Sequence, residues 1–511
     1  MAESSVPVVS PTPASPAPAA RPARRIKPGS ISVIQGLLLV IVGSGSFAAA
    51  FMAPKAGPLI VLFLFCVARL CRQATPARAL VLGLLLGILA YIPQAFYAAG
   101  GMGPGVTLTM VAWPLGVAVV AWIGHLAWRR GAAGLGLLIL PFLWVGLEYV
   151  LTEVCPPQWG WLDAGVAMPA EALHHLVGVY GLAFILMLIA AITAGVRGLP
   201  GFIAMLVAIG ASWGLSLWQL PASGAAAVAA SAAASAPAGG GLPTVVTVPG
   251  HFTARTISAA LAEAVKEHPE SAIVVLPDYS LSRNDPVVRW AQNQKKFVVT
   301  ATREGDRHSG RATDILVVTD SRGDTALVVN RQLGAGPPED AEPDLADTPW
   351  GKIALMPFHD LARRWDTDRS VKAGAKAFIV LNPDAEPGNI QMREERTHLA
   401  EVRAAEYGVP VVRASTSGVC QLITSRGVVK ESVEAGAPLA GTLDMAGDAG
   451  IPLGGLLAPV CLGIAVVYIL VELVLIALAD RRAKAVGRSG SSAMPPAAPP
   501  PPPPPSPPAA V

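Results

Sequence analysis

Long apolar stretches recur through the first 220 residues of this 511-residue chain, and one more follows near its end. They lie at residues 31–53, 57–71, 79–99, 106–128, 133–152, 174–196, 198–220 and 453–479. A helix needs about 20 apolar residues to cross the hydrocarbon of a bilayer, and most of these stretches approach that length. Only 14% of the residues are charged, whereas an ordinary soluble domain has about 25%. The sequence therefore predicts a polytopic membrane protein with eight spans.

Basic residues gather in alternate loops, which predicts the orientation of the spans. The loops that carry them hold Arg24, Arg25 and Lys27; Arg69, Arg72 and Arg78; Arg129 and Arg130; Arg197; and Arg481, Arg482, Lys484 and Arg488. The remaining short loops hold only Lys55. Because cytoplasmic loops are enriched in Lys and Arg, we expect both termini in the cytoplasm and residues 242–450 on the external side. A net charge of +3 is close to balance and gives no reason to expect a nucleic-acid partner.

Composition divides the rest of the chain. Residues 1–28 and 480–511 are expected to be disordered cytoplasmic tails, because their Pro-rich ends cannot bury a core. Residues 29–220 are expected to form a membrane domain with seven helices, followed by an Ala/Ser/Gly linker at 221–241. Residues 242–450 form the external domain, and residues 453–479 the eighth span.

Short β-type runs replace the apolar spans in the external domain. They lie at 244–250, 272–277, 297–302, 314–320, 325–332, 352–357, 377–382, 410–416 and 420–427. Helical patterns lie between them at 256–267 and 392–407. Nearly continuous apolar strands with intervening helices predict a buried sheet covered by helices. The five cysteines have no CxxC spacing and no neighbouring histidines, so the sequence predicts no metal site and no disulfide framework.

Polar and aromatic side chains in and beside the spans are candidates for function. Four polar residues fall inside predicted spans: Gln94, His125, Glu148 and Glu472. Such residues are costly in a membrane and often functional, although helix-end side chains that reach the interface would also explain them. Trp159 and Trp161 lie in an external loop, where they are expected either to anchor the loop at the membrane interface or to line a lipid entrance.

Residues 374–429 carry a series of short motifs: Asn382-Pro383, His398-Leu399-Ala400, Arg403-Ala404-Ala405-Glu406, and Arg413-Ala414-Ser415 before Gly418. With these motifs the segment resembles the carbon–nitrogen hydrolase (nitrilase) superfamily, and most of all its apolipoprotein N-acyltransferase branch. The stretches "EYVLTEVCPPQWGWLDAG" (148–165) and "HHLVGVYGLAFIL" (174–186) are similar to membrane segments of that branch. The resemblance covers roughly residues 31–480.

The resemblance implies an α-β-β-α sandwich for the external domain, beside a multi-span α-helical membrane domain. It also implies a catalytic triad of Glu, Lys and Cys that needs no cofactor. In such a triad the thiolate holds the acyl group covalently, the carboxylate takes a proton, and the cation stabilises the oxyanion.

The triad positions of this chain hold other residues. The base position falls on Asp278, which is one methylene shorter than Glu, and a misplacement of about 1 Å can cost roughly a hundredfold in rate. The nucleophile position falls on Met356, at the end of the run "KIALM". A thioether has no proton to lose and cannot form a thioester by the family's mechanism.

The lysine position falls on Asn330, with Arg331 beside it. No lysine lies between Lys296 and Lys352, so the absence does not depend on the register of the alignment. The loop glutamate of the family corresponds to Glu339.

Other residues could in principle replace the missing groups. Cys420 lies on a late strand, where a small buried core cysteine is the simpler reading. His359 and Asp360 follow Met356 closely, and a surface turn explains them better than a replacement pair.

The family enzyme moves a fatty acyl chain from a phospholipid to the N-terminal Cys of a lipoprotein. The resemblance therefore implies a multi-pass protein of the bacterial inner membrane, with a periplasmic (external) domain and a role in lipoprotein maturation. Because the triad is replaced, we expect a catalytically silent relative that binds phospholipid or lipoprotein, or assists a partner membrane protein. The alternative is a working or altered acyltransferase.

Overall fold

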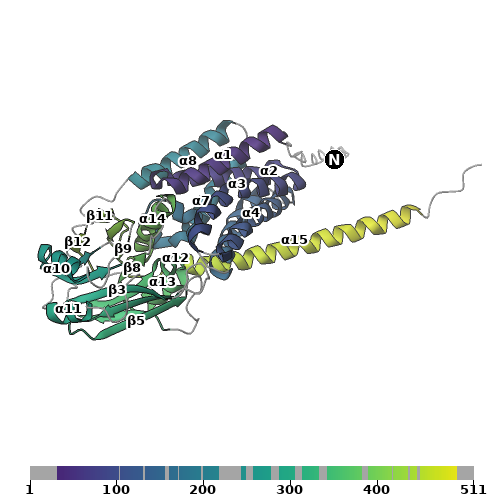
Figure 1. Cartoon of the computed structure of the whole chain (residues 1–511). Coiled ribbons are helices and arrows are strands. Elements are labelled where there is room, and N and C mark those ends of the chain that lie inside the picture. The colour runs from purple at the N-terminus through teal and green to yellow at the C-terminus, as the bar shows by residue number, and fades with distance from the viewer. Residues whose placement is uncertain are drawn as a thin grey trace, which may run out of the picture.

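A helix bundle and an α/β sandwich lie next to each other in the structure (Figure 1). The computed structural model describes residues 31–102, 104–130, 133–155, 160–170, 172–196, 199–217, 243–248, 257–277, 287–304, 313–332, 342–382, 390–416, 418–434, 438–445 and 449–491.

The bundle consists of long apolar helices. They are α1 (Val33–Met52), α2 (Ile60–Gln73), α3 (Pro76–Met102), α4 (Pro104–Arg130), α5 (Ala133–Tyr149), α7 (Ala172–Gly195), α8 (Leu199–Leu217) and α15 (Gly454–Ser491). Within the described residues, seven helical stretches are long and apolar enough to cross a membrane. The short second span that the sequence predicted is lengthened by the turn η1 (Pro54–Leu59), so that it runs over 19 residues from Lys55 to Gln73. The chain is thus a multi-pass membrane protein.

Two helices differ from the sequence prediction. Helix α8 corresponds to the span predicted at 198–220, but its apolar part, Pro200–Gly214, is shorter than the other spans; residues 218–220 lie outside the described part of the chain. Helix α15 continues to Ser491, although a disordered tail was predicted from residue 480. The Ala, Arg and Lys residues of this stretch are good helix formers, and the first proline after residue 480 is Pro495. The predicted tails at 1–28 and 492–511 lie outside the described residues.

The sandwich contains two six-stranded sheets. Sheet A has the order β12 (Leu439–Thr442), β1 (Thr244–Thr247), β2 (Ser271–Leu276), β3 (Phe297–Glu304), β4 (Thr313–Thr319), β5 (Thr325–Gln332). Sheet B has the order β11 (Val429–Val433), β10 (Cys420–Ile423), β9 (Val411–Ser415), β8 (Ala375–Asn382), β7 (Gly351–Pro357), β6 (Leu345–Thr348). Strands β1–β3 and β7–β9 are parallel, so their carboxyl ends share one edge of each sheet.

Apolar layers hold the sandwich together and join it to the bundle. The two sheets face each other across buried side chains such as Val275, Leu316 and Ile379. Helices α10 (Ile257–Glu267) and α11 (Val287–Gln294) cover the outer face of sheet A. This is the predicted α-β-β-α sandwich, and the predicted fold class is confirmed.

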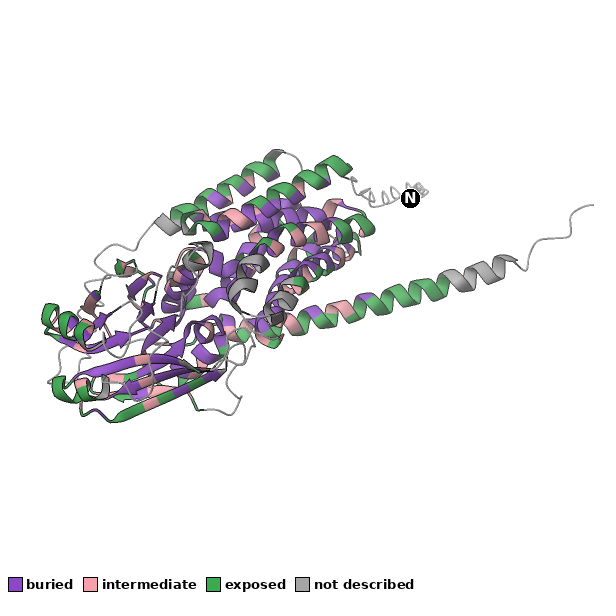
Figure 2. Ribbon diagram, in the orientation of Figure 1, coloured by how far each residue is buried: buried purple, intermediate pink, exposed green. Residues whose placement is uncertain are grey.

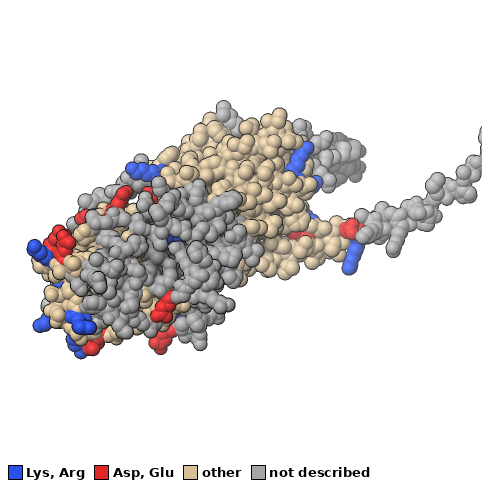
Figure 3. Space-filling view, in the orientation of Figure 1, with Lys and Arg blue, Asp and Glu red and all other residues tan. Residues whose placement is uncertain are grey.

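The outer face of sheet B is covered by α12 (Phe358–Ala362), α13 (Arg364–Lys372) and α14 (Ile390–Tyr407). Helix α14 lies between sheet B and α7 (Figure 1), and the apolar layer beneath it continues into the bundle. Figure 2 shows buried residues both in the sheets and in the helices that adjoin them. On the face drawn in Figure 3, charged side chains gather on the sandwich and the flank of the bundle is nearly free of them, as contact with lipid requires.

The close approach of α3 and α4 depends on a glycine, which gives a first prediction. A Cβ added at Gly87 would lie 2.5 Å from the Cα of Pro114, so Gly87→Ala must push the two helices apart. We expect a loss of about 1–3 kcal/mol in the free energy of unfolding, measured as a lower melting temperature of the purified protein. Gly463→Ala in α15 is the control, because its Cβ would meet nothing within 4 Å. Equal melting temperatures for the two variants would contradict the close packing.

Candidate functional site

Strand β7 ends where the family resemblance places a nucleophile. Met356 is 3% exposed and lies next to Val380 of β8, which in turn pairs with Arg413 of β9. The side chain of Met356 belongs to the apolar layer between sheet B and the bundle. The position that the resemblance assigns to a nucleophile therefore holds a packed thioether, which has no proton to lose.

Cys420 lies on the other face of the same sheet. Its fully buried side chain belongs to the layer between the two sheets, whereas Met356 faces the bundle. The thiol sulfur accepts a hydrogen bond from the backbone N–H of Ser415 at 3.4 Å and the thiol donates to the Ser415 carbonyl at 3.6 Å. The structure thus places this thiol in the core, on the face of sheet B that points away from Met356.

Strand β5 carries the two residues expected at the lysine position, and they point in opposite directions. Arg331 is buried and shares a strand face with Val329 of the layer between the sheets, while Asn330 is exposed. The Nε of Arg331 donates to Oδ2 of Asp360 at 2.7 Å, and its Nη2 pairs with Asp344. Of the two, Arg331 is the residue that reaches the segment after Met356.

Asp360 connects Arg331 to a larger group of charges on α12 and α13. We call this group the Arg331 network: Arg331, Asp344, His359, Asp360, Arg363, Asp366 and Arg369. Asp360 lies 3.4 Å from Nη1 of Arg363 and 3.6 Å from Nε2 of His359. Two carboxylates thus pair with the Arg331 guanidinium, whereas an oxyanion-stabilising cation must have N–H groups that face the reacting atom.

Burial changes the titration of two members of this network. It lowers the pKa of His359, and this effect outweighs the opposing effect of Asp360. Burial, followed by the neighbouring Asp360, raises the pKa of Asp366 to about 7, against the opposing effect of Arg363. His359 is therefore neutral at physiological pH, and the charge of the network changes close to neutrality.

Three of the site residues predicted from the sequence, Asp278, Glu339 and Trp159, lie outside the described residues. The residue before Asp278 can be placed: the carbonyl of Pro277 accepts a hydrogen bond from Oγ1 of Thr416 at 2.8 Å. The carboxyl end of β2 in sheet A therefore meets the carboxyl end of β9 in sheet B. That Asp278 joins Arg331 and Met356 at this edge stays a prediction.

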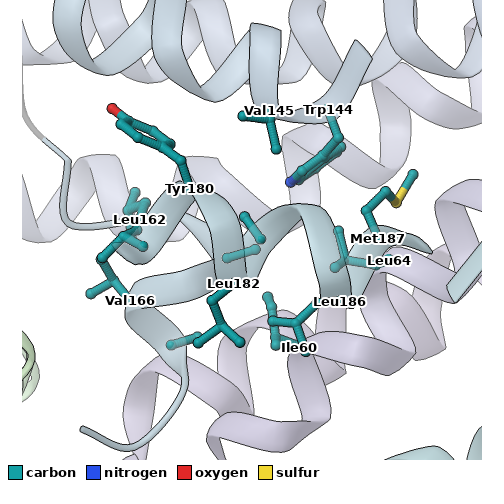
Figure 4. Packing of buried hydrophobic residues seen from close by; sticks show 14 of the residues in the cluster. Ile60, Leu64, Trp144, Val145, Leu162, Val166, Tyr180, Leu182, Leu186 and Met187 are labelled. Atoms are coloured by element: carbon teal, nitrogen blue, oxygen red, sulfur yellow. The ribbon is translucent and has the colours of Figure 1, made fainter. Parts of the chain in front are cut away.

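Trp161 lies in the loop that connects α5 to α7. It is 5% exposed and packs in the apolar layer shared by the bundle and the sandwich. Figure 4 shows Leu162 from the same loop and Val166 from the short helix that follows it on the side of α7 that carries Tyr180. The loop is thus a packed part of the junction, and the role of Trp161 at a lipid entrance stays a prediction.

A second polar cluster, which the sequence did not reveal, lies where α14 meets α7. Gly178 has a φ of 69°, which interrupts the helical conformation of α7. Glu406 of α14 accepts a hydrogen bond from the N–H of Val179 at 3.0 Å and from Nη1 of Arg403 at 2.5 Å. Burial acts to raise the pKa of Glu406, but Arg403 and Arg364 outweigh it and bring the pKa below its usual value. Glu406 is therefore an ionised carboxylate that fastens the sandwich to a break in a membrane helix.

The sequence could have predicted the Arg403–Glu406 pair of this cluster, but not its contact with α7. A spacing of three residues puts Arg403 and Glu406 on one face of a helix, where they can pair. The backbone N–H of Val179 is 227 residues away from Glu406 and carries no sequence signature.

No protein-family model matches the chain, and no curated protein sequence matches it. Among solved structures, the chain is similar to a carbon-nitrogen hydrolase from Helicobacter pylori (16% identity, 40% of this chain and 89% of that one, TM-score 0.33). It is also similar to Saccharomyces cerevisiae Nit3, a member of branch 10 of the nitrilase superfamily (18% identity, 40% and 90%, TM-score 0.33), and to an amidase from Nesterenkonia sp. (12% identity, 40% and 91%, TM-score 0.32). At these TM-scores the likeness decides neither family nor activity.

The Arg331 network gives a second prediction. Arg331→Ala leaves Asp360, whose side chain is 2% exposed, without its closest cation. Removing one partner of a buried ion pair typically costs about 3–5 kcal/mol, so we expect a clearly lower melting temperature. Arg322→Ala is the control, because Arg322 pairs with Asp320 on the surface with its side chain 79% exposed, and surface pairs contribute little. The prediction is wrong if the two variants melt at the same temperature.

Proposed function

We propose that this protein is a catalytically silent membrane relative of the apolipoprotein N-acyltransferases, which binds a phospholipid or the lipid-modified N-terminus of a lipoprotein. The observation that carries the proposal is the packed thioether of Met356 at the end of β7, where the family's motifs require a thiol. Covalent acyl transfer needs a nucleophile that can lose a proton, and Met356 has none.

The surroundings of Met356 support the same conclusion. Arg331 is held by Asp344 and Asp360, and His359 is a neutral, largely buried neighbour of the same network. These groups stabilise one another, which is the behaviour of a structural network. Cys420 offers no replacement, because it lies on the other face of sheet B.

The proposal includes a place in the cell. The distribution of basic residues favours a bacterial inner membrane, with both termini in the cytoplasm and the sandwich in the periplasm. On that side the junction between sandwich and bundle faces the outer leaflet, where phospholipid and lipoproteins with lipid-modified N-termini are available as ligands.

The third prediction tests catalysis. The full-length protein in phospholipid vesicles should not acylate a peptide that carries an N-terminal diacylglyceryl-cysteine, and no thioester should be trapped on the protein. It should still retain the lipopeptide. Mass spectrometry of the peptide and the protein measures transfer, and co-purification of a fluorescent lipopeptide measures retention. Met356→Cys alone should restore no turnover, because the base position still holds Asp278 and no lysine lies between Lys296 and Lys352.

Each other outcome has a defined meaning. Acyl transfer that survives Cys420→Ala would disprove catalytic silence, and transfer that is lost in Cys420→Ala would identify a relocated nucleophile. If the protein neither transfers an acyl group nor retains the lipopeptide, a lipid-modified N-terminus is not its ligand.

The fourth prediction tests orientation. In intact cells and a Cys155→Ser background, a membrane-impermeant thiol reagent should label Arg322→Cys in the sandwich and should not label Arg482→Cys near the end of α15. Both positions are exposed, and the other cysteines are buried. Permeabilised cells provide the control in which both positions react. The reverse pattern in intact cells would place the sandwich in the cytoplasm and remove lipoproteins as ligands.

A further inference from the structure

Two carboxyl groups are buried side by side in the junction between the bundle and the sandwich. Glu148 lies near the end of α5 and is 0% exposed, and Asp163 lies in the loop before α6 (Ala164–Ala167) and is 1% exposed. Oε1 of Glu148 accepts hydrogen bonds from Nε1 of Trp144 and from the backbone N–H of Ala164, both at 2.8 Å. The second N–H belongs to the residue directly after Asp163, so the two acids share one small region.

Each acid keeps one oxygen without a hydrogen-bond partner among the described residues. These atoms are Oε2 of Glu148 and Oδ1 of Asp163. The hydroxyl of Tyr91 on α3 is fully buried in the same region and also lacks a described hydrogen-bond partner. Buried polar groups are normally paired. The two unpaired carboxylate oxygens therefore point to a hydrogen atom that a deprotonated pair does not have.

The charges around the pair do not compensate two carboxylates. The charged and titratable groups that face it or its loop are Tyr91 from α3, Glu153 from η2 (Val150–Val154), His174 and Tyr180 from α7, and His398, Arg403 and Glu406 from α14. The nearby cations are already engaged: Arg403 pairs with Glu406, and Arg364 of α13 lies 3.5 Å from Asp368 and 3.9 Å from Glu406.

Arg403 and Arg364 therefore pair with Glu406 and Asp368, and no ion pair of the described residues joins either arginine to Glu148 or Asp163. Arg403 offsets the charge of Asp163 only in part. A buried carboxylate without a counterion normally binds a proton. Burial first, and the charge of Glu148 second, raise the pKa of Asp163 well above its usual range.

We propose that Glu148 and Asp163 share at least one proton at neutral pH, and that this proton keeps the sandwich docked on the membrane helices. The protonated carboxyl donates a hydrogen bond to the other acid. At alkaline pH the proton leaves, two negative charges face each other in a buried site, and the loop from 160 to 167 loosens from α5 and α7.

The direction of the pH effect follows from linkage. The carboxyl of Asp163 has a higher pKa in the folded protein than its value of about 3.9 in the unfolded chain. The protonated carboxyl contributes its full stabilisation when the pH is below its pKa in the unfolded chain. The contribution falls as the pH rises above that pKa, and it is lost once the pH exceeds the pKa in the folded protein. The junction should thus weaken on the alkaline side.

The fifth prediction is tested on the full-length protein in lipid nanodiscs. Infrared difference spectra between about pH 7 and about pH 10, a range that passes a raised carboxyl pKa, should show the loss of a protonated-carboxyl C=O band. Asp163→Asn or Glu148→Gln should remove or shift that band. The melting temperature of the unmodified protein should fall over the same pH range, and the slope should be shallower in both variants because their amides cannot ionise.

Asp347→Asn is the control, because Asp347 is exposed on β6 and its loss should change neither the band nor the slope. Two results would overturn the proposal: no protonated-carboxyl band in the unmodified protein at neutral pH, or melting-temperature slopes in Asp163→Asn and Glu148→Gln as steep as that of the unmodified protein. The infrared measurement on the unmodified protein stands even if a variant fails to fold.

Discussion

A buried hydrogen bond between Glu406 and the backbone of α7 joins the two halves of this protein within their shared apolar layer. The left-handed conformation at Gly178 interrupts α7, and the carboxylate of Glu406 accepts a hydrogen bond from Val179 at that break. Arg403 holds Glu406 and also donates to the carbonyls of Leu361 and Ala362 at the end of α12. The helix that follows Met356 is thereby tied to a membrane helix. Sheet B consequently has helices on its outer face that touch the bundle directly instead of water.

The packing around Met356 is consistent with the proposed catalytic silence. A reactive centre needs groups whose hydrogen bonds are kept for a substrate, and such groups reduce stability. Here Met356 packs in an apolar layer, and Arg331 forms ion pairs with Asp344 and Asp360. The position that the family resemblance assigns to a nucleophile lies in the joint between the sandwich and the bundle.

The sequence pattern predicted the interior of the sandwich better than its borders. The nine β-type runs correspond to the central strands and their neighbours, whereas β6, β11 and β12 were not predicted. All three lie at sheet edges, and β11 is largely exposed. An edge strand is buried on fewer sides and needs fewer apolar residues, so its periodicity is weak. Helix α15 also continues beyond the span that hydropathy predicted. The residues after Asp480 are less apolar, but they still favour a helix.

The sequence by itself determined the class of this protein, because a span of about 20 apolar residues can satisfy its backbone in a bilayer only as a helix. It also determined that Met356 cannot act as a thiol, which follows from chemistry alone. Only the tertiary structure decided between Asn330 and Arg331, since strand alternation turns one outward and brings the other to Asp360, 29 residues further along the chain. The meeting of Glu148 with Asp163, and of Glu406 with Val179, was likewise decided by packing. Such contacts depend on how elements distant in sequence are oriented, and no local pattern of residues encodes that orientation.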